Sequence, residues 1–120
     1  AEDEMITAVS FDAPSHAAYA KLRHPASHFA IVGVAASLDV DGGVCTGARV
    51  AVTGASTHAL RLGAVEDALT GSSLDDDAIA AAAGAASVED ANADLAGSEA
   101  YRQAMTQVFT GRAIAAAANR

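Results

Sequence analysis

The sequence predicts an α+β domain in which an antiparallel sheet is followed by helices. In the first half of the chain, short runs rich in valine, isoleucine and threonine show the period of two that strands require. After about residue 56, the apolar residues recur instead at the spacing of a helix. Strands that precede helices are typical of an antiparallel sheet with helices beside it, so we expect about four strands followed by a bundle of three helices.

Of the two early segments, 5–11 is predicted as a strand, and 17–24 is open between a strand and a helix. Residues 5–11 are rich in residues that favour strands, and the run ends before Asp12 and Pro14. The residues of 17–24 permit a helix as well as a strand. Alanine favours a helix, whereas Pro25 disfavours helical backbone at the residue before it. The residues alone leave this segment open.

Residues 29–40 form the clearest strand pattern in the chain. Both alternating rows of side chains are apolar, so we expect this strand at the centre of the sheet, with each face at least partly covered. Asp41-Gly42-Gly43 predicts a tight hairpin turn, because glycine supplies the positive φ of a type I′ turn. Residues 44–53 are then the antiparallel partner strand.

The second half of the chain predicts three helices. The first runs from about residue 58 to 70, ends at Gly71 and carries an apolar stripe of Leu62, Val65 and Leu69. Ser73 is the candidate N-cap of the second helix, which runs to about residue 86 after three aspartates that suit the positive end of its dipole. Residues 87–97 have no period and predict a loop. Ser98 is the expected N-cap of the third helix, one face of which holds Tyr101, Met105, Val108 and Arg112.

The composition limits the classes of function open to the chain. Its 120 residues fit a single domain, and 52% hydrophobic but only 4% aromatic residues mean that small side chains must fill the core. The formal net charge of −8 argues against nucleic-acid binding and against docking to anionic membranes. No run is long and apolar enough to insert into a membrane. A single cysteine, Cys45, permits neither an internal disulfide nor a thiolate metal cage, which suits a cytoplasmic protein.

The stretch 18–36 is the most informative part of the sequence. It holds the only lysine, Lys21, which forms a basic cluster with Arg23 and His24 in an otherwise acidic chain. A contact with an anionic group is therefore expected here. His24 and His28 have the spacing of metal ligands on a helix, but Pro25 lies between them and no acidic or cysteine ligand is near, so no metal site is predicted.

Several motifs together resemble a known family. They follow the family's order and cover nearly the whole chain: 5–9 (MITAV), 18–36 (AYAKLRHPASHFAIVGVAA), 50–55 (VAVTGA) with Arg61, 65–71 (VEDALTG) and 94–102 (DLAGSEAYR). In these motifs the chain is similar to the C-terminal domain of the FAD-binding medium subunit of aerobic carbon monoxide dehydrogenases. These enzymes belong to the xanthine oxidase group of molybdenum hydroxylases.

The resemblance implies a fold and a role. It favours a strand for 17–24 and the same α+β architecture, and it implies that residues 1–120 are a fragment of a longer FAD-binding subunit. In such enzymes the large subunit oxidises the substrate at a molybdenum cofactor, and two [2Fe–2S] clusters of the small iron–sulfur subunit pass the electrons to FAD. The family's glycine-rich FAD loops lie in other domains. The chain is therefore expected to close one side of the FAD site and to contact the iron–sulfur subunit, without a catalytic residue of its own.

Lys21 is the one cofactor-binding residue that the resemblance implies, because the family's lysine at this position reaches the flavin. The alternative is an ordinary exposed lysine. Arg61, Tyr101 and Arg102 are interpreted as structural: an arginine satisfies backbone carbonyls, and the tyrosine is a partly buried anchor. The alternative function is a stand-alone α+β protein-interaction module without a cofactor, because no phosphate-binding loop or nucleophile motif is complete in the sequence.

Overall fold

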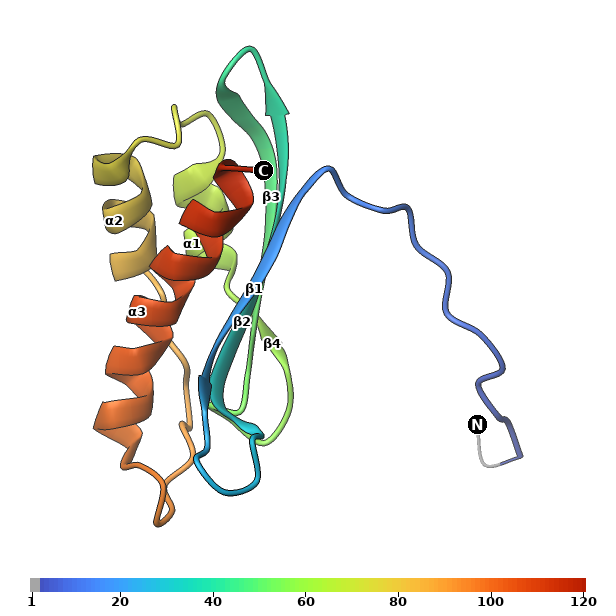
Figure 1. Cartoon of the computed structure of the whole chain (residues 1–120), viewed down its shortest axis with the longest axis vertical. Helices are drawn as coiled ribbons and strands as arrows, with labels where there is room; N and C mark the ends of the chain where they lie inside the picture. Colours follow the sequence, from blue (N-terminus) through green and yellow to red (C-terminus); the bar gives the residue numbers. More distant parts are fainter. Residues whose placement is uncertain (1–2) are drawn as a thin grey trace.

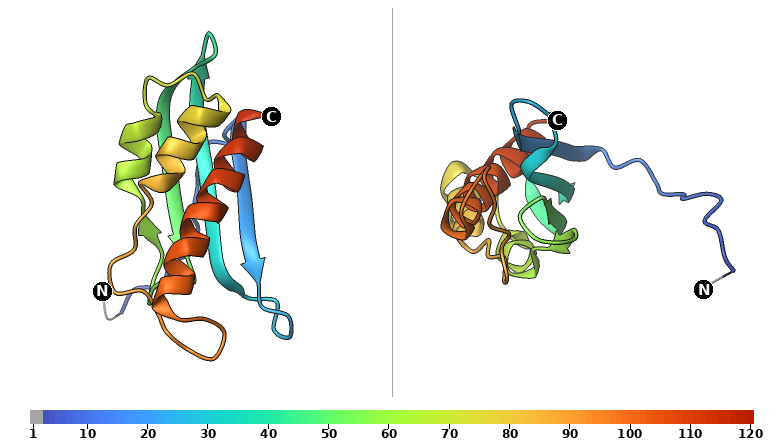
Figure 2. Two further views of the ribbon diagram at one scale, coloured as in Figure 1. Left: turned by 90° about the vertical axis from the view of Figure 1, so that its left-hand side faces the viewer. Right: turned by 90° about the horizontal axis from the view of Figure 1, so that it is seen from below.

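A four-stranded antiparallel sheet with all of its helices on one side makes up the fold (Figure 1). We describe it from a computed structural model that covers residues 3–120. Within that range the elements, in chain order, are β1 (His16–Arg23), β2 (Ala30–Asp41), β3 (Val44–Thr53), β4 (Leu60–Arg61), α1 (Gly63–Leu69), α2 (Asp76–Gly84) and α3 (Glu99–Ala118). Figure 2 shows α3 lying along the length of the sheet, with α1 and α2 beside it. The predicted α+β class is confirmed.

The strands lie in the order β1-β2-β3-β4, so each pairs with its neighbours along the chain. Ala36 in β2 lies opposite Ala18 in β1 and Val50 in β3, which places β2 inside the sheet as expected. The predicted hairpin between β2 and β3 is confirmed. Gly42 and Gly43 have φ of 56° and 82°, the left-handed pair that a type I′ turn requires and that glycine adopts without strain.

The core lies between the helices and one face of the sheet. Alternate residues of β2 point into it and are buried: Val32, Val34, Ala36 and Leu38. Phe109, Ala113, Ile114 and Ala117 of α3 cover them. The alanines let the helix backbone approach the sheet closely, which is how a chain poor in aromatic residues fills its interior. Each fully buried valine or leucine contributes roughly 1.5–3 kcal/mol relative to an exposed one.

The other face of the sheet is open. The second row of β2 was expected to be partly covered as well, but no described helix lies over it, and Ala35 there is exposed. Gly33 in the same row is buried, because the ring of Tyr19 lies against it: a Cβ added at Gly33 would come within 2.2 Å of the Tyr19 hydroxyl. The sequence pattern shows that both rows are apolar, but the described helices cover only one of them.

The prediction of a strand at 5–11 is wrong. Residues 4–14 lie outside every strand and form an exposed arm that leaves the domain on the side of the open face (Figure 1). A strand exists only where another strand satisfies its backbone groups, and within the described residues none lies beside the arm. The fourth strand is instead β4, a segment of two residues that pairs with β3 at Ala51 and Val52.

The helices begin at residues slightly different from those predicted. The helix predicted from residue 58 starts at Gly63, because Leu60 and Arg61 are taken into the sheet. Asp75 and not Ser73 caps α2: its carboxylate accepts a hydrogen bond from the Ala78 N–H at 2.8 Å. The Ser98 cap of α3 is confirmed by the contact of its hydroxyl with the Tyr101 N–H.

The face of α3 that was singled out is not the buried one. Tyr101 and Val108 are exposed, and the buried positions are Arg102, Thr106, Phe109, Thr110, Ala113, Ile114 and Ala117. Small and polar residues form much of the buried face, because α3 packs close to the sheet and its first turn contacts backbone carbonyls. Hydrophobicity alone therefore indicated the wrong side of this helix.

Candidate functional site

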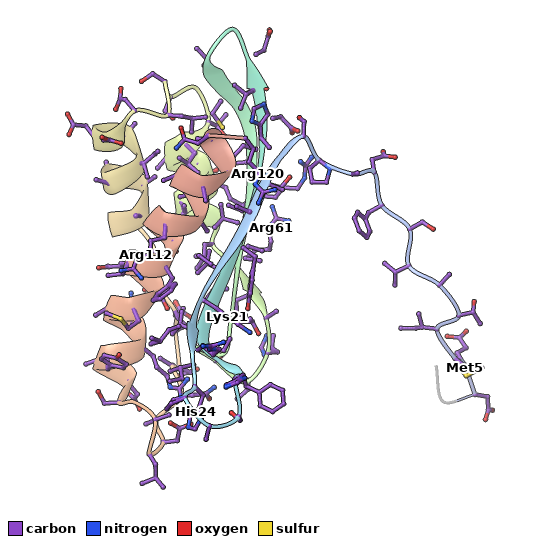
Figure 3. The ribbon with its side chains drawn as sticks, viewed as in Figure 1. Met5, Lys21, His24, Arg61, Arg112 and Arg120 are labelled. Atoms are coloured by element: carbon purple, nitrogen blue, oxygen red, sulfur yellow. The ribbon has the colours of Figure 1, made fainter. Side chains whose placement is uncertain are left out.

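Lys21 lies in β1 on the open face of the sheet, close to the turn that joins β1 to β2 (Figure 3). Its ammonium donates a hydrogen bond to the carbonyl oxygen of His28 at 3.1 Å. Lysine has three donor protons, so this contact leaves two for another acceptor. Lys21 and Arg23 are both exposed. The basic cluster predicted from the sequence therefore lies at the surface, with its lysine tied to the turn.

The β1–β2 turn, residues 24–29, is built on His24. The backbone N–H of His24 donates to Phe29 O at 2.8 Å, and the N–H of His28 donates to His24 O at 2.9 Å. The Nδ1 atom of His24 accepts from the backbone N–H groups of Ala26 and Ser27, each at 3.2 Å. His24 thus holds the turn together through its backbone and its Nδ1 atom. His28 takes the left-handed conformation, with φ of 63°.

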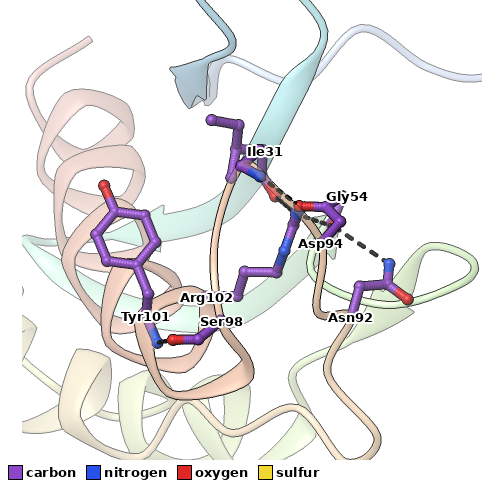
Figure 4. Close-up of polar contacts among 8 residues, drawn as sticks. Ile31, Gly54, Asn92, Asp94, Ser98, Tyr101 and Arg102 are labelled. Atoms are coloured by element: carbon purple, nitrogen blue, oxygen red, sulfur yellow. Dashed lines mark hydrogen bonds and ion pairs between the residues drawn. The ribbon is translucent and has the colours of Figure 1, made fainter.

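Arg102 ties the start of α3 to the end of the sheet (Figure 4). Its side chain is buried, with 3% of the residue exposed. One terminal nitrogen donates to Ile31 O at 2.6 Å and to Gly54 O at 2.8 Å, and the other donates to Asp94 Oδ1 at 2.7 Å. The guanidinium therefore links segments that lie 71 and 48 residues away along the chain. This agrees with the structural role that the sequence indicated for Arg102.

Asp94 completes this cluster at the surface. Its carboxylate accepts from Arg102 and from the backbone N–H of Ala96, and these hydrogen bonds hold the pKa of Asp94 below its ordinary value. Asn92 adds a longer contact from its side-chain nitrogen to Gly54 O, at 3.5 Å. Together they fix the loop between α2 and α3 against the end of the sheet.

A polar hollow of about 250 Å³ opens beside the turn. Residues of the turn, of the sheet end and of the α2–α3 loop line it, among them Ser27, Phe29, Gly54, Asn92 and Asp94. Gly54 has φ of 78°, and a Cβ there would come within 2.4 Å of Ala30 O, so glycine is required at this position. Phe29 stands at the rim with 78% of its surface exposed. Lys21 does not line this hollow.

Arg61 belongs to a separate structural pair on the open face. Its Nε and terminal nitrogen donate to the two carboxylate oxygens of Glu66 at 2.6 and 2.7 Å. Glu66 also accepts from the Val50 N–H at 2.8 Å, which joins α1 to β3. The hydrogen bonds from Arg61 and Val50 lower the pKa of Glu66. The pair therefore supports the structural interpretation of Arg61.

Sequence reasoning missed the partners of these arginines. Glu66 and Gly54 lie in quoted motifs but were given no contact with Arg61 or Arg102, and only the folded chain reveals these pairs. Asp94 and Arg102 lie in the same quoted motif, and their spacing of eight residues was the available signal. Residues 3–120 contain no group of three or more His, Cys, Asp or Glu side chains placed to hold a metal ion. No helix in this range is both long and apolar enough to cross a membrane.

The fold and these contacts define an antiparallel α+β domain with one open sheet face and a hydrogen-bonded turn next to the cations of β1. The chain belongs to the CO dehydrogenase flavoprotein C-terminal domain family, whose model matches residues 17–117. The resemblance seen in the sequence is thereby confirmed. No curated protein sequence matches the chain at a significant level.

Solved structures of oxidoreductases share the fold. The carbon monoxide dehydrogenase of Hydrogenophaga pseudoflava, in a form that lacks the Mo-pyranopterin moiety, is 35% identical over 90% of this chain and 38% of its own, with a TM-score of 0.80. The carbon monoxide dehydrogenase of Oligotropha carboxidovorans is 28% identical over 88% of this chain and 37% of its own, also at 0.80. Quinoline 2-oxidoreductase from Pseudomonas putida 86 is 28% identical over 87% of this chain and 37% of its own, with a TM-score of 0.80. The chain thus spans little more than a third of these proteins' matched chains.

Proposed function

We propose that this chain is the C-terminal domain of the flavoprotein subunit of a carbon monoxide dehydrogenase-like molybdenum hydroxylase. In this role it closes one side of the FAD site and helps electrons to pass from an iron–sulfur subunit to FAD. The observation that carries the proposal is the family match over residues 17–117, supported by 35% identity to a solved carbon monoxide dehydrogenase chain. The molybdenum cofactor and the [2Fe–2S] clusters belong to partner subunits in this proposal.

The matched share of the solved chains supports the assignment of FAD binding mainly to another part of the subunit. The chain covers 37–38% of their length, so most of such a subunit lies outside the matched part. We propose that residues 1–120 are a fragment of a longer subunit whose other part holds most of the FAD. This chain then covers one side of the FAD site and contributes no catalytic group.

Lys21 is the residue that fits an anionic cofactor best. Its ammonium is exposed, and only one of its donors is directed to His28 O, which leaves charge and hydrogen-bonding capacity for a second acceptor. FAD carries phosphates and gains negative charge on its ring as it accepts electrons. A nearby ammonium stabilises both. The contact with His28 also fixes the direction of the lysine without consuming its charge.

Replacement of Lys21 tests this role. In the subunit that carries this domain, Lys21→Ala should weaken FAD retention about tenfold or more, because a hydrogen bond to a charged group is worth roughly 1.5–3 kcal/mol. Lys21→Arg, which keeps the charge, should recover part of the affinity. FAD content after gel filtration and the rate of flavin reduction are the two readouts. If both stay at the wild-type level in Lys21→Ala, Lys21 is an ordinary surface lysine that holds the turn.

A further inference from the structure

The ring of His24 accepts hydrogen bonds within the β1–β2 turn. Its Nδ1 atom lies 3.2 Å from the backbone nitrogen of Ala26 and 3.2 Å from that of Ser27, and both N–H groups donate to it. A ring nitrogen accepts only through its lone pair, so Nδ1 carries no proton in this arrangement. The imidazole is then neutral and its single proton is on Nε2. The two backbone donors thus assign both the charge and the tautomer of His24 in the closed turn.

Protonation of the ring removes this acceptor. Both nitrogens of an imidazolium carry protons, so the N–H groups of Ala26 and Ser27 would meet a third donor in place of a lone pair. The two hydrogen bonds are therefore lost together. Histidine is the side chain that ordinarily changes its charge between about pH 5 and pH 8. The closed turn depends on the neutral form of this residue type.

The backbone of the turn is strained at His28. Its φ of 63° lies in the left-handed region, which residues other than glycine adopt at a cost. The bonds that hold it there include the contact of the His28 N–H with His24 O at 2.9 Å and that of the His24 N–H with Phe29 O at 2.8 Å. Strain of this kind persists only while the surrounding bonds maintain it. Loss of the two bonds to the His24 ring therefore favours an open form of the turn.

The turn also holds Lys21. The Lys21 ammonium donates to the carbonyl oxygen of His28 at 3.1 Å, and Figure 3 shows Lys21 and His24 towards the same end of the sheet. A change in the backbone at His28 moves this acceptor. Opening of the turn therefore releases the lysine from its present direction.

Three charged or titratable groups lie near His24 on its own strand and turn. Lys21 and Arg23 of β1 are exposed cations, and neither is a partner for a protonated ring. His28 is exposed and titrates in the same range as any histidine, so it needs a control of its own. The ring of His28 makes no hydrogen bond within residues 3–120, and only its backbone takes part in the turn.

Two further charged groups come from the elements packed beside the turn. Asp94 of the α2–α3 loop and Arg102 of α3 line the same polar hollow as His24. They pair with each other at 2.7 Å, and in the described part of the chain neither is joined to His24 by a hydrogen bond or ion pair. The hydrogen bond from Arg102 is the main cause that lowers the pKa of Asp94, so Asp94 stays charged where histidine titrates. The environment thus changes little in this range apart from the histidines.

We propose that His24 is a protonation switch of the β1–β2 turn. With a neutral ring the turn is closed and His28 O holds Lys21. With a protonated ring the turn opens and Lys21 is released. The closed form is therefore present at the upper end of the histidine range and is lost as the pH falls. One consequence rests on the proposed function: in a subunit that holds FAD through Lys21, the cofactor is retained less well at the lower pH.

Nuclear magnetic resonance of the 120-residue chain tests the switch. The ¹⁵N shifts of labelled histidine rings identify the protonated nitrogen, and His24→Asn assigns the signals of His24 among the four histidines. The ¹³Cα and ¹³Cβ shifts of Ala26, Ser27 and His28 follow the turn. His24→Asn is also the matched control, because an asparagine side-chain oxygen accepts from the same backbone N–H groups and does not titrate. His28→Gln removes the other histidine of the turn.

At pH 8 the His24 ring should carry its proton on Nε2. Between pH 8 and pH 5 the turn shifts should move together with the ring shifts of His24, and the open population should rise about tenfold or more as two hydrogen bonds are lost. His28→Gln should keep this response and His24→Asn should lose it. A proton on Nδ1 at pH 8 overturns the proposal. So do turn shifts that stay fixed while His24 is protonated, or a response that persists in His24→Asn. If the isolated chain does not fold, the same labels are read in the subunit that carries it.

FAD retention separates the switch from the proposed function. In the subunit that carries this domain, the rate of FAD dissociation is measured at pH 8 and at pH 5.5 for the wild type and for His24→Asn. Loss of FAD that becomes severalfold faster at pH 5.5 in the wild type alone supports the switch and the role of Lys21 together. Equal rates, with a turn that still moves with His24, support the switch but contradict the contact of Lys21 with FAD. A turn that does not move overturns the switch at any FAD rate, and Lys21→Ala still tests the proposed function.

Discussion

Arg102 joins the sheet, the α2–α3 loop and α3 through three hydrogen-bond acceptors, and it is almost fully buried. Arg102→Ala would leave the carbonyls of Ile31 and Gly54 without this partner, so we expect a loss of about 3 kcal/mol or more in the free energy of unfolding. Arg102→Lys should recover only part of this, because an ammonium cannot span the same acceptors. Urea denaturation measures both.

Arg112 provides the matched control on the same helix. It is exposed and contacts the ring of Phe109, with 4.8 Å from its guanidinium carbon to the ring centroid. Arg112→Ala should cost no more than about 1 kcal/mol. Equal losses for the two alanine variants would contradict the assignment of Arg102 as the residue that ties the sheet end to α3.

Glu66 makes stability depend on pH. Its pKa is lowered in the folded state by Arg61 and Val50, so its stabilising contribution is present above the ordinary value and is lost as the pH falls through the folded value. Asp94 behaves in the same way through Arg102. Urea midpoints should therefore fall between about pH 5 and pH 3. Glu66→Gln should flatten part of this fall, because it removes the carboxylate that Arg61 and the Val50 N–H stabilise. A curve unchanged by Glu66→Gln would contradict this linkage.

The sequence correctly predicted the structural elements that depend on residues within or next to them. The β2–β3 hairpin depends on Gly42 and Gly43, which lie between the strands that they join, and the Ser98 cap lies next to the helix that it starts. The strand at 5–11 and the short β4 could not be placed correctly, because a strand is defined by its neighbour. The sequence shows the pattern of residues 5–11 but not that, within residues 3–120, no strand lies beside it.

In the candidate site too, contacts between residues close in sequence were predictable, whereas contacts between distant residues were not. Lys21 and its turn lie within a few residues of one another, so the sequence located the basic cluster. The Arg102 contacts with Ile31 and Gly54 bridge separations of 71 and 48 residues, and only the folded chain shows them. Periodicity also failed on α3, because its buried face combines alanine and threonine with an arginine that no hydropathy pattern assigns to a core.

The arm should contribute nothing to the stability of the isolated domain. A chain that begins at Ser15 loses Met5, Ile6, Val9 and Phe11, all of which are exposed, so its free energy of unfolding should change by less than about 0.5 kcal/mol. Leu38→Ala, in the core, should cost about 2–5 kcal/mol for comparison. Chemical denaturation of the three proteins checks this. A clear loss on truncation would show that the arm packs on its own domain.

The sheet has one face covered by helices and one open face whose centre is lined by Ala17, Ala35 and Ala51. The exposed arm extends on the open side. In our account this asymmetry makes the domain a component of a larger flavoprotein. The isolated chain should therefore fold cooperatively but should not bind FAD stoichiometrically, since the proposed function assigns most of the cofactor's contacts to the other part of the subunit. Fluorescence titration with FAD tests this, and tight binding of one FAD per chain would contradict it.

The most direct measurement of the central claim is FAD retention by a chimera in which this domain replaces the matched part of the Hydrogenophaga pseudoflava carbon monoxide dehydrogenase chain, which shares 35% identity with it. The comparison protein is the same dehydrogenase chain truncated before the matched part. After gel filtration, flavin absorbance per protein gives the FAD content of each. We predict that the chimera keeps close to one FAD per chain, whereas the truncated protein loses most of it. A chimera that folds but retains no more FAD than the truncated protein would show that this domain does not close a flavin site.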